Sequence, residues 1–182
     1  MPGYSKLATQ VLGLLSLGLL LGYARGQRQR YELKKEADGL WRAMDREALF
    51  RILRFLKMKK MIEVIEKSDG ERSIKITKSG RERAREFQIQ QINVARPAKW
   101  DGRWRIVIFD IPEKRKKMRD GLRRHLKRLG FHELQKSVFV VPYPCEREIQ
   151  TITKLMDLEG NLRYLEASFS FDKDLRKEFS LP

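Results

Sequence analysis

Cysteine and histidine are nearly absent from this sequence of 182 residues. Cys145 is the only cysteine, and His125 and His132 are the only histidines. A single cysteine excludes a disulfide within one chain and a zinc site built from the cysteines of one chain. The two histidines do not stand in the spacing of metal ligands. The lone thiol fits a reducing, cytoplasmic environment, and we expect both histidines to be structural or surface residues.

A long hydrophobic run is also missing, although one stretch comes close. Residues 7–23 carry no charge, but seventeen residues is at the short limit for crossing a bilayer. Thr9, Gln10 and Ser16 dilute the run further, and no secretory cleavage site follows it. We interpret the stretch as a first helix that is buried in its domain and ends near its glycines. The alternative is a membrane anchor.

Acidic residues are few relative to basic ones. Forty Lys and Arg stand against 24 Asp and Glu, which gives a net charge of +16 and a pI near 10.2. Residues 1–99 hold 22 basic and 11 acidic residues, whereas residues 100–182 hold 18 and 13. This excess makes nucleic acid the expected partner and an anionic membrane the second choice. The length allows two small domains, and most of the positive charge belongs to the first.

The N-terminal half contains a strongly amphipathic helix. Asp45 is a suitable N-cap, and apolar residues follow it at helical spacing, namely Leu49, Ile52, Leu53 and Leu56. Projection onto a helix of 3.6 residues per turn defines the opposite side. That outward side carries Glu47, Arg51, Arg54 and Met58, with Lys57 on its flank.

A β-hairpin and a further helix are predicted next. Two strands, 62–67 and 72–77, flank an Asp69-Gly70 turn, which supplies the positive φ angles of a tight hairpin. A helix over residues 81–91 leads to a linker at 93–99. Residues 25–39 are either a short second helix or a basic linker. A helical region, an outward basic helix and a charged hairpin together indicate a winged helix-turn-helix domain over residues 1–92.

Such a domain predicts binding to double-stranded DNA. An arginine can bond to a guanine edge or to a phosphate, and hairpin cations can reach the backbone or the minor groove. The alternatives are that these charges only solvate a surface, or that the domain binds another protein. The candidate DNA-binding residues are Arg42, Arg46, Arg51, Arg54, Lys57, Lys67, Arg72 and Lys75.

The C-terminal half predicts a ferredoxin-like β-α-β-β-α-β domain over residues 100–182, which makes the chain an α+β protein. A buried strand at 105–109 stops before Pro112. The predicted elements that follow are a helix ending at Gly130, strands at 131–134 and 138–141, a helix at 149–158, a strand at 162–169 and a short terminal helix at 173–179. We expect this domain to form a homodimer.

Three ordered motifs carry a family resemblance. They are W-D-G-x-W-R-I-V-I-F-D-I-P-E-K from Trp100, then L-x-x-L-G-F and Q-K-S-V-F-V. Residues 100–169 resemble the central domain of PaaX-type transcriptional repressors, which is itself similar to the small CRISPR adaptation protein that accompanies the integrase. The resemblance implies a winged helix ahead of this domain and a further domain after it. Because this chain ends at Pro182, we expect no small-molecule ligand, including an acyl-coenzyme A inducer.

Asp110, at the end of the first strand of this domain, has two interpretations. The resemblance implies that two copies of this aspartate can hold a divalent ion at a twofold interface and cleave phosphodiesters, which makes Asp110 the candidate catalytic and metal-binding residue. Glu113 is the nearest other carboxylate. The alternative, which we favour, is that Asp110 caps the next helix. No cofactor is expected, and Mg²⁺ only if the chain is a nuclease.

The helix after Pro112 is unusually basic. Residues 113–130 hold nine Lys and Arg against two acidic residues. Charge on a helix is usually a solvated face, but this excess also suggests a second phosphate-contacting surface. Its candidate residues are Lys114, Arg115, Arg119 and Arg123.

These observations predict a cytoplasmic, homodimeric DNA-binding transcriptional regulator of the repressor type, which would bind a palindromic site. One alternative is a CRISPR adaptation-type protein or metal-dependent nuclease that acts through Asp110. Another is a regulator tethered to the membrane by residues 7–23.

Overall fold

The computed structural model describes residues 2–15, 45–66 and 72–182, and it has the mixed α+β composition predicted from the sequence. The chain divides into two compact units, Met1–Gln88 and Ile89–Pro182. Within the described ranges, no helix is long and apolar enough to cross a membrane. Most of the uncharged stretch, from residue 16 onward, lies outside these ranges.

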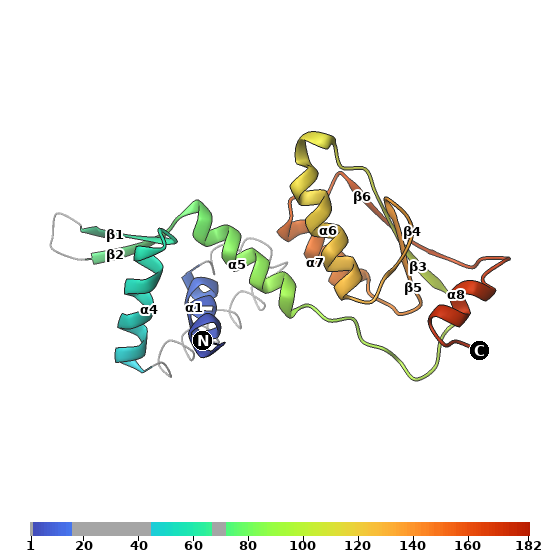
Figure 1. The fold of residues 1–182 in the computed structure, drawn as a ribbon, viewed down its shortest axis with the longest axis horizontal. Helices are drawn as coiled ribbons and strands as arrows, with labels where there is room; N and C mark the ends of the chain where they lie inside the picture. Colours follow the sequence, from blue (N-terminus) through green and yellow to red (C-terminus); the bar gives the residue numbers. More distant parts are fainter. Residues whose placement is uncertain (1, 16–44, 67–71) are drawn as a thin grey trace, which may run out of the picture. The chain divides into compact units, whose positions relative to one another are not determined.

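The first unit contains helices and one hairpin (Figure 1). Its elements are α1 (Pro2–Leu15), α4 (Arg46–Met58), β1 (Ile62–Glu66), β2 (Arg72–Ile76) and α5 (Lys78–Gln91), whose last turn belongs to the second unit. The predicted helices and the predicted pair of strands are therefore present. The segment 25–39 and the Asp69-Gly70 turn lie outside the described residues.

Helix α4 begins as its sequence predicts. The Asp45 carboxylate accepts a hydrogen bond from the backbone N–H of Ala48 at 2.8 Å, which satisfies one of the unpaired donors at the start of the helix. The apolar stripe of α4 faces a core shared with α1, β1 and α5. That core is formed by Ala8, Val11, Leu12, Ile52, Leu56, Ile62 and Ala84.

The hairpin and α5 are joined through Thr77. Strands β1 and β2 pair antiparallel, from Ile62 opposite Ile76 to Glu66 opposite Arg72. The Thr77 hydroxyl accepts from the backbone N–H of Gly80 at 3.1 Å and donates to the carbonyl of Lys60 at 2.8 Å. Thr77 thus caps α5 and ties it to the turn after α4.

The second unit is built on one four-stranded antiparallel sheet with the order β4-β5-β3-β6. Between its strands the chain runs in the predicted order β-α-β-β-α-β. The elements are β3 (Trp104–Phe109), the 3-10 helix η1 (Glu113–Arg115), α6 (Lys116–Arg128), β4 (His132–Gln135), β5 (Val138–Val141), α7 (Glu146–Leu155), β6 (Leu162–Ala167) and α8 (Lys173–Glu178).

The two faces of this sheet are covered differently. Alternate residues of β3 point to opposite faces. Val107 and Phe109 join the core under α6 and α7, whereas Trp104 and Ile106 pack on the other face with Leu175 of α8. The first core is the larger, and the last turn of α5 contributes to it. The second face is only partly covered.

The predicted boundaries differ from the observed ones at a few positions. Helix α6 stops at Arg128, and Gly130 adopts a φ of +89°, which glycine tolerates better than other residues. The predicted strand at 131–134 is displaced by one residue, to 132–135. The sixth strand ends at Ala167, before Phe169.

Candidate functional site

Helix α4 exposes the basic residues that the sequence placed on its outward side. Ile52 and Leu56 are 1% and 0% exposed, whereas Arg51 and Arg54, on the opposite side of the helix, are exposed. Arg46 and Lys57 are exposed as well, and Glu47 is the acidic residue among them. Unlike the buried stripe, this face is free to contact a charged partner.

The structure describes only some of the other residues of this unit that the sequence predicted to contact DNA. Lys75 is exposed on β2, where its Cα lies opposite Glu63. The backbone of Arg72 is part of β2, opposite Glu66. Arg42 and Lys67 lie outside the described residues. The structure therefore places the cations of α4 on one exposed helix face, and it leaves Lys75 exposed on the hairpin.

Two large apolar side chains share the outward face of α4. Phe50 is 62% exposed and Met58 is 71% exposed. The helical projection placed Met58 outward, but it did not identify Phe50, which follows Leu49 directly and breaks the apolar periodicity. This break in the apolar spacing is the sequence signal that could have identified Phe50 as exposed. The face is therefore amphipathic in itself, with guanidinium groups beside an aromatic ring.

Asp110 does not cap the next helix, so that prediction is wrong. The first helical residue is Glu113, its N-cap position is Pro112, and no side chain caps it. Because Ile111 and Pro112 separate Asp110 from the helix, its carboxylate is not at the capping position. Only the backbone of Asp110 is held, since its N–H donates to the carbonyl of Asn161 at 2.9 Å and its carbonyl accepts from the Asn161 amide at 2.8 Å.

The surroundings of Asp110 do not fit a resident Mg²⁺ site within one chain. Glu113 is bound by Arg119 at 2.8 Å, and this contact is the main reason that the pKa of Glu113 is lowered. The Asn161 side chain accepts from Arg115 at 3.1 Å. Among the residues that the structure describes, no group of three or more His, Cys, Asp and Glu is placed to hold a metal ion.

Three of the four residues predicted for a second basic surface have partners inside the second unit. Arg115 donates to Asn161 and to the carbonyl of Asp157 at 2.8 Å. Arg119 pairs with Glu113, and Arg123 pairs with Glu133 of β4. Lys114 is exposed. The predicted surface therefore has to be redrawn around the cations that have no partner among the described residues.

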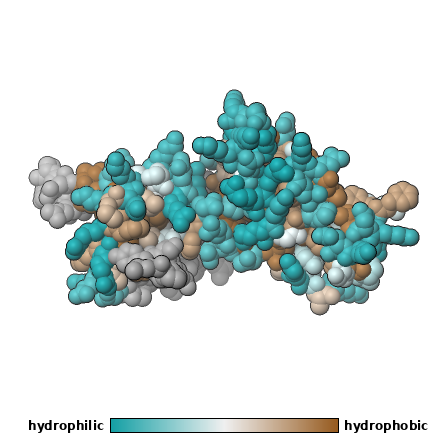
Figure 2. All heavy atoms as spheres, in the orientation of Figure 1, coloured by the Kyte–Doolittle hydropathy of each residue, from teal (hydrophilic) through white to brown (hydrophobic). Residues whose placement is uncertain are grey.

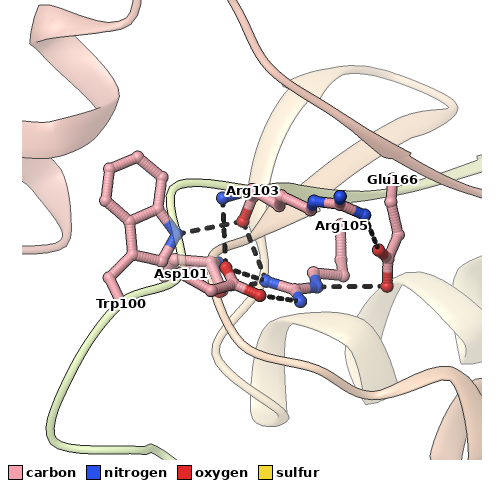
Figure 3. Close-up of polar contacts among 6 residues, drawn as sticks. Trp100, Asp101, Arg103, Arg105 and Glu166 are labelled. Atoms are coloured by element: carbon pink, nitrogen blue, oxygen red, sulfur yellow. Dashed lines mark hydrogen bonds and ion pairs between the residues drawn. The ribbon is translucent and has the colours of Figure 1, made fainter.

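The Trp100-Asp101-Gly102-Arg103-Trp104-Arg105 motif folds around one buried guanidinium group (Figure 3). The side chain of Arg105 is 4% exposed and donates to the Asp101 carboxylate at 2.7 Å, to the Arg103 carbonyl at 2.9 Å and to the Pro142 carbonyl at 2.9 Å. Its Nε lies 3.5 Å from Glu166. The sequence motif was recognised, but these contacts were not predicted.

The contacts that Arg105 makes with these residues stabilise the fold. Hydrogen bonds from Arg105 lower the pKa of Asp101 to about 2, and the two carboxylates compensate a charge that would otherwise be buried alone. On the opposite face, the Trp104 indole donates to Asp172 at 2.9 Å, and its ring lies near those of Trp100 and Phe179. The motif thus joins β3, β5, β6 and α8.

Cys145 is buried, and burial raises its pKa to about 12. A thiol with so high a pKa is a poor nucleophile at neutral pH, because the thiolate is the reactive form. The cysteine belongs to the core under α6 and α7.

Residues 97–178 match the family model of the PaaX protein central Cas2-like domain. The match agrees with the resemblance that the motifs between Trp100 and Phe169 indicated. It covers most of the second unit and no residue of the first. A comparison of the chain with curated proteins found no match.

Proposed function

We propose that this protein is a DNA-binding transcriptional repressor that acts in the cytoplasm as a homodimer. The observation that carries the proposal is the exposed basic face of α4, which the fold presents next to a charged hairpin. With α1, α4, β1, β2 and α5 in this order, we interpret the first unit as a winged helix-turn-helix domain. The PaaX-like second unit supports the same assignment, because the resemblance is to a family of transcriptional repressors.

In this proposal α4 is the helix that enters the major groove. The groove is about 12 Å wide and accepts one helix. Arg51 and Arg54 would bond to guanine edges or phosphates, Arg46 and Lys57 would hold the backbone, and Lys75 would contact phosphates from the hairpin. Four of these five cations belong to α4, and Glu47 is the only acidic residue of that helix. The fifth, Lys75, belongs to the hairpin.

The second unit would form the dimer through the uncovered part of its sheet. Ile108 and Leu165 are 37% and 47% exposed on the face that α8 covers only in part. Val138 of β5 lies opposite Ile108, and Leu165 of β6 lies opposite the buried Ile106. Two copies that cover this apolar patch with each other would generate a twofold axis. A twofold protein predicts an inverted-repeat DNA site.

The proposal is tested with the double variant Arg51→Ala/Arg54→Ala. We expect its affinity for duplex DNA to fall at least about 10-fold, because each well-placed arginine contact is worth about 1–3 kcal/mol. The dependence of the affinity on salt should also weaken. A matched control, Lys78→Ala/Arg83→Ala, removes two exposed cations from α5 of the same unit. Equal binding by the wild type and the α4 variant would contradict the proposal.

The match to a Cas2-like domain favours a second candidate, a nucleic-acid-processing protein that acts through Asp110. The exposed Asp110 carboxylate at the end of β3 is the residue that would matter. Under the repressor proposal, the purified chain leaves duplex DNA and RNA intact in the presence of Mg²⁺. Cleavage that requires Mg²⁺ and disappears in Asp110→Ala would support the second candidate instead.

A further inference from the structure

The basic segment from Glu113 to Gly130 contains two kinds of cation. Its nine Lys and Arg form one group in the sequence, but the structure separates those that hold the fold together from those that do not. Contacts within the fold therefore account for only part of the positive charge of this segment.

Five of the nine cations are used within the second unit. Lys127 lies 2.7 Å from Glu133 and is the main reason that the pKa of Glu133 is lowered, and Arg123 pairs with the same carboxylate. Arg128 donates to the carbonyls of Ile89 and Ile92 at 2.7 and 3.0 Å, which closes the C-terminal end of α5. Arg115 and Arg119 have the partners given above. These residues fix α6 to its neighbours.

Three other cations are exposed and make no ion pair or hydrogen bond with any described residue, namely Lys114, Lys117 and Arg124. Lys114 lies in η1, and we call the other two, which both lie in α6, the α6 cation row. Lys117 and Arg124 are seven residues apart, so they lie on the same side of α6, about 10 Å apart along its axis. Asp120 is the one carboxylate between them. Lys116 lies at the limit of an ion pair with Glu113, at 4.0 Å.

We propose that the α6 cation row binds the sugar-phosphate backbone of duplex DNA. Figure 2 shows a hydrophilic surface over α6, and the carboxylates of Glu113 and Glu133 are already bound by Arg119 and Lys127. Cations spaced along a helix can neutralise successive backbone phosphates and release counterions.

An anionic membrane fits this surface less well. A helix that binds a membrane surface buries its apolar face among the lipids. The apolar face of α6, with Leu122 and Leu126 both 0% exposed, is instead buried in the protein core. What α6 offers to solvent is charge without apolar anchors. This favours phosphates in water over lipid headgroups.

The inference deepens the proposed function and rests on it for the identity of the ligand. In this scheme α4 reads the sequence, whereas the α6 cation row adds binding that does not depend on sequence. The two contributions use different residues in different units, so they can be separated by mutation.

The test uses full-length protein carrying Lys117→Gln/Arg124→Gln and a random-sequence duplex of about 30 base pairs. Affinity is measured over a series of KCl concentrations. We expect the affinity at low salt to fall about 10-fold, and the slope of log K against log [salt] to decrease by about 0.9 for each lost phosphate contact. Because neither residue has an ion-pair or hydrogen-bond partner among the described residues, the melting temperature should not change.

The matched control is Lys173→Gln/Lys177→Gln, which removes the same charge from exposed positions of α8 on the opposite face of the sheet. It should retain wild-type affinity and slope. A second variant, Lys117→Arg/Arg124→Lys, keeps the charges and should also bind normally. An unchanged slope in Lys117→Gln/Arg124→Gln, or an equal loss in the α8 control, would overturn the inference.

The two proposals fail in different ways. If Arg51→Ala/Arg54→Ala loses DNA binding and the α6 variant does not, the function stands and the α6 site is wrong. If the wild type binds no duplex DNA, both are wrong. Loss of binding to single-stranded RNA, or to vesicles of anionic lipid, without a change for duplex DNA would also contradict the α6 site.

Discussion

At the residue scale, Arg105 shows how one buried charge organises the motif that carries the family resemblance. Its guanidinium group links a turn, β3 and the end of β5, and its Nε lies near Glu166 of β6. Leaving such a group without its partners would be costly, because a buried charge needs compensation. The residues around Trp100 are therefore explained by the stability of the second unit, without a role in chemistry.

The free energy of unfolding at acidic pH tests this account. In the folded protein the pKa of Asp101 is lowered to about 2 from an ordinary value of 3.8. A lowered pKa stabilises the fold above the ordinary value, and this stabilisation is lost as the pH falls from about 4 towards 2. We expect Asp101→Asn to be less stable than the wild type at pH 7 by about 1 kcal/mol, since the carboxylate is half exposed.

Urea unfolding of both proteins between pH 2 and pH 7 measures the difference. The stability gap should shrink towards the acid end, where the wild-type carboxyl becomes protonated. A gap that stays constant down to pH 2 would show that the charge of Asp101 is not what stabilises Arg105. High salt should narrow the gap at neutral pH.

Phe50 gives a second prediction at this scale, and it depends on α4 lying in the major groove. An exposed ring between basic residues is suited to contact the methyl group of thymine. Replacing the relevant thymines of a selected site with deoxyuridine removes only that methyl group. We expect wild-type affinity to fall about 4-fold, the equivalent of about 0.8 kcal/mol for one buried CH₂ group.

The variant Phe50→Ala should bind both duplexes equally, whereas Phe171→Ala, which removes an exposed ring from the second unit, should discriminate as the wild type does. Binding is measured by fluorescence anisotropy with paired duplexes. Discrimination that survives in Phe50→Ala would exclude this residue as the reader of the methyl group.

At the scale of elements, Met61, the residue before β1, comes so close to the start of α5 that position 80 requires glycine. A Cβ added to Gly80 would lie 2.1 Å from the Met61 carbonyl oxygen, and backbone atoms cannot move aside cheaply. We expect Gly80→Ala to destabilise the first unit by at least about 2 kcal/mol. In contrast, a Cβ at Gly13 of α1 meets nothing within 4 Å, so Gly13→Ala should stabilise by about 0.5–1 kcal/mol.

Thermal unfolding followed by circular dichroism distinguishes these two changes. If both variants lowered the melting temperature equally, packing at Gly80 would not be the cause. If Gly80→Ala were as stable as the wild type, the contact between Met61 and α5 would not be a constraint in solution.

The elements were largely predictable because their signals are local. The helical spacing of Leu49, Ile52 and Leu56 and the cap at Asp45 come from adjacent residues, and so does the buried run at 105–109. The partners of Arg105 were not predictable, since Asp101, Pro142 and Glu166 come from three segments that only the sheet brings together. For the same reason, the sequence could not show that Glu133 of β4 neutralises cations of α6.

The site was predictable to a smaller extent. Arg51 and Arg54 follow from helical periodicity, and the structure places both on the exposed face. The role of Asp110 at a helix start was wrong because the backbone turns through Ile111 and Pro112 before the helix begins. Arg42 and Lys67 lie outside the described residues and remain predictions.

At the scale of the whole molecule, the proposed homodimer depends on the uncovered face of the sheet. Leu165 lies opposite Ile106 on that face and is 47% exposed. We expect Leu165→Glu to dissociate the dimer, because two copies of the charge would meet at the twofold axis without a partner. Analytical ultracentrifugation should give twice the chain mass of 21.6 kDa for the wild type and one chain mass for the variant.

The matched control is Val64→Glu, which adds the same charge at an exposed apolar position of the hairpin in the first unit. It should remain dimeric. A wild type that sediments as a monomer, or a Leu165→Glu variant that stays dimeric, would show that the sheet face is not the interface.

The central claim is that two copies of this chain recognise one symmetric stretch of duplex DNA. Selection of binding sites from a random duplex library with the full-length protein tests it most directly. The account predicts enrichment of an inverted repeat that is bound by two chains per duplex and is lost with Arg51→Ala/Arg54→Ala. Enrichment of no sequence, or of a site without twofold symmetry that one chain occupies, would contradict it.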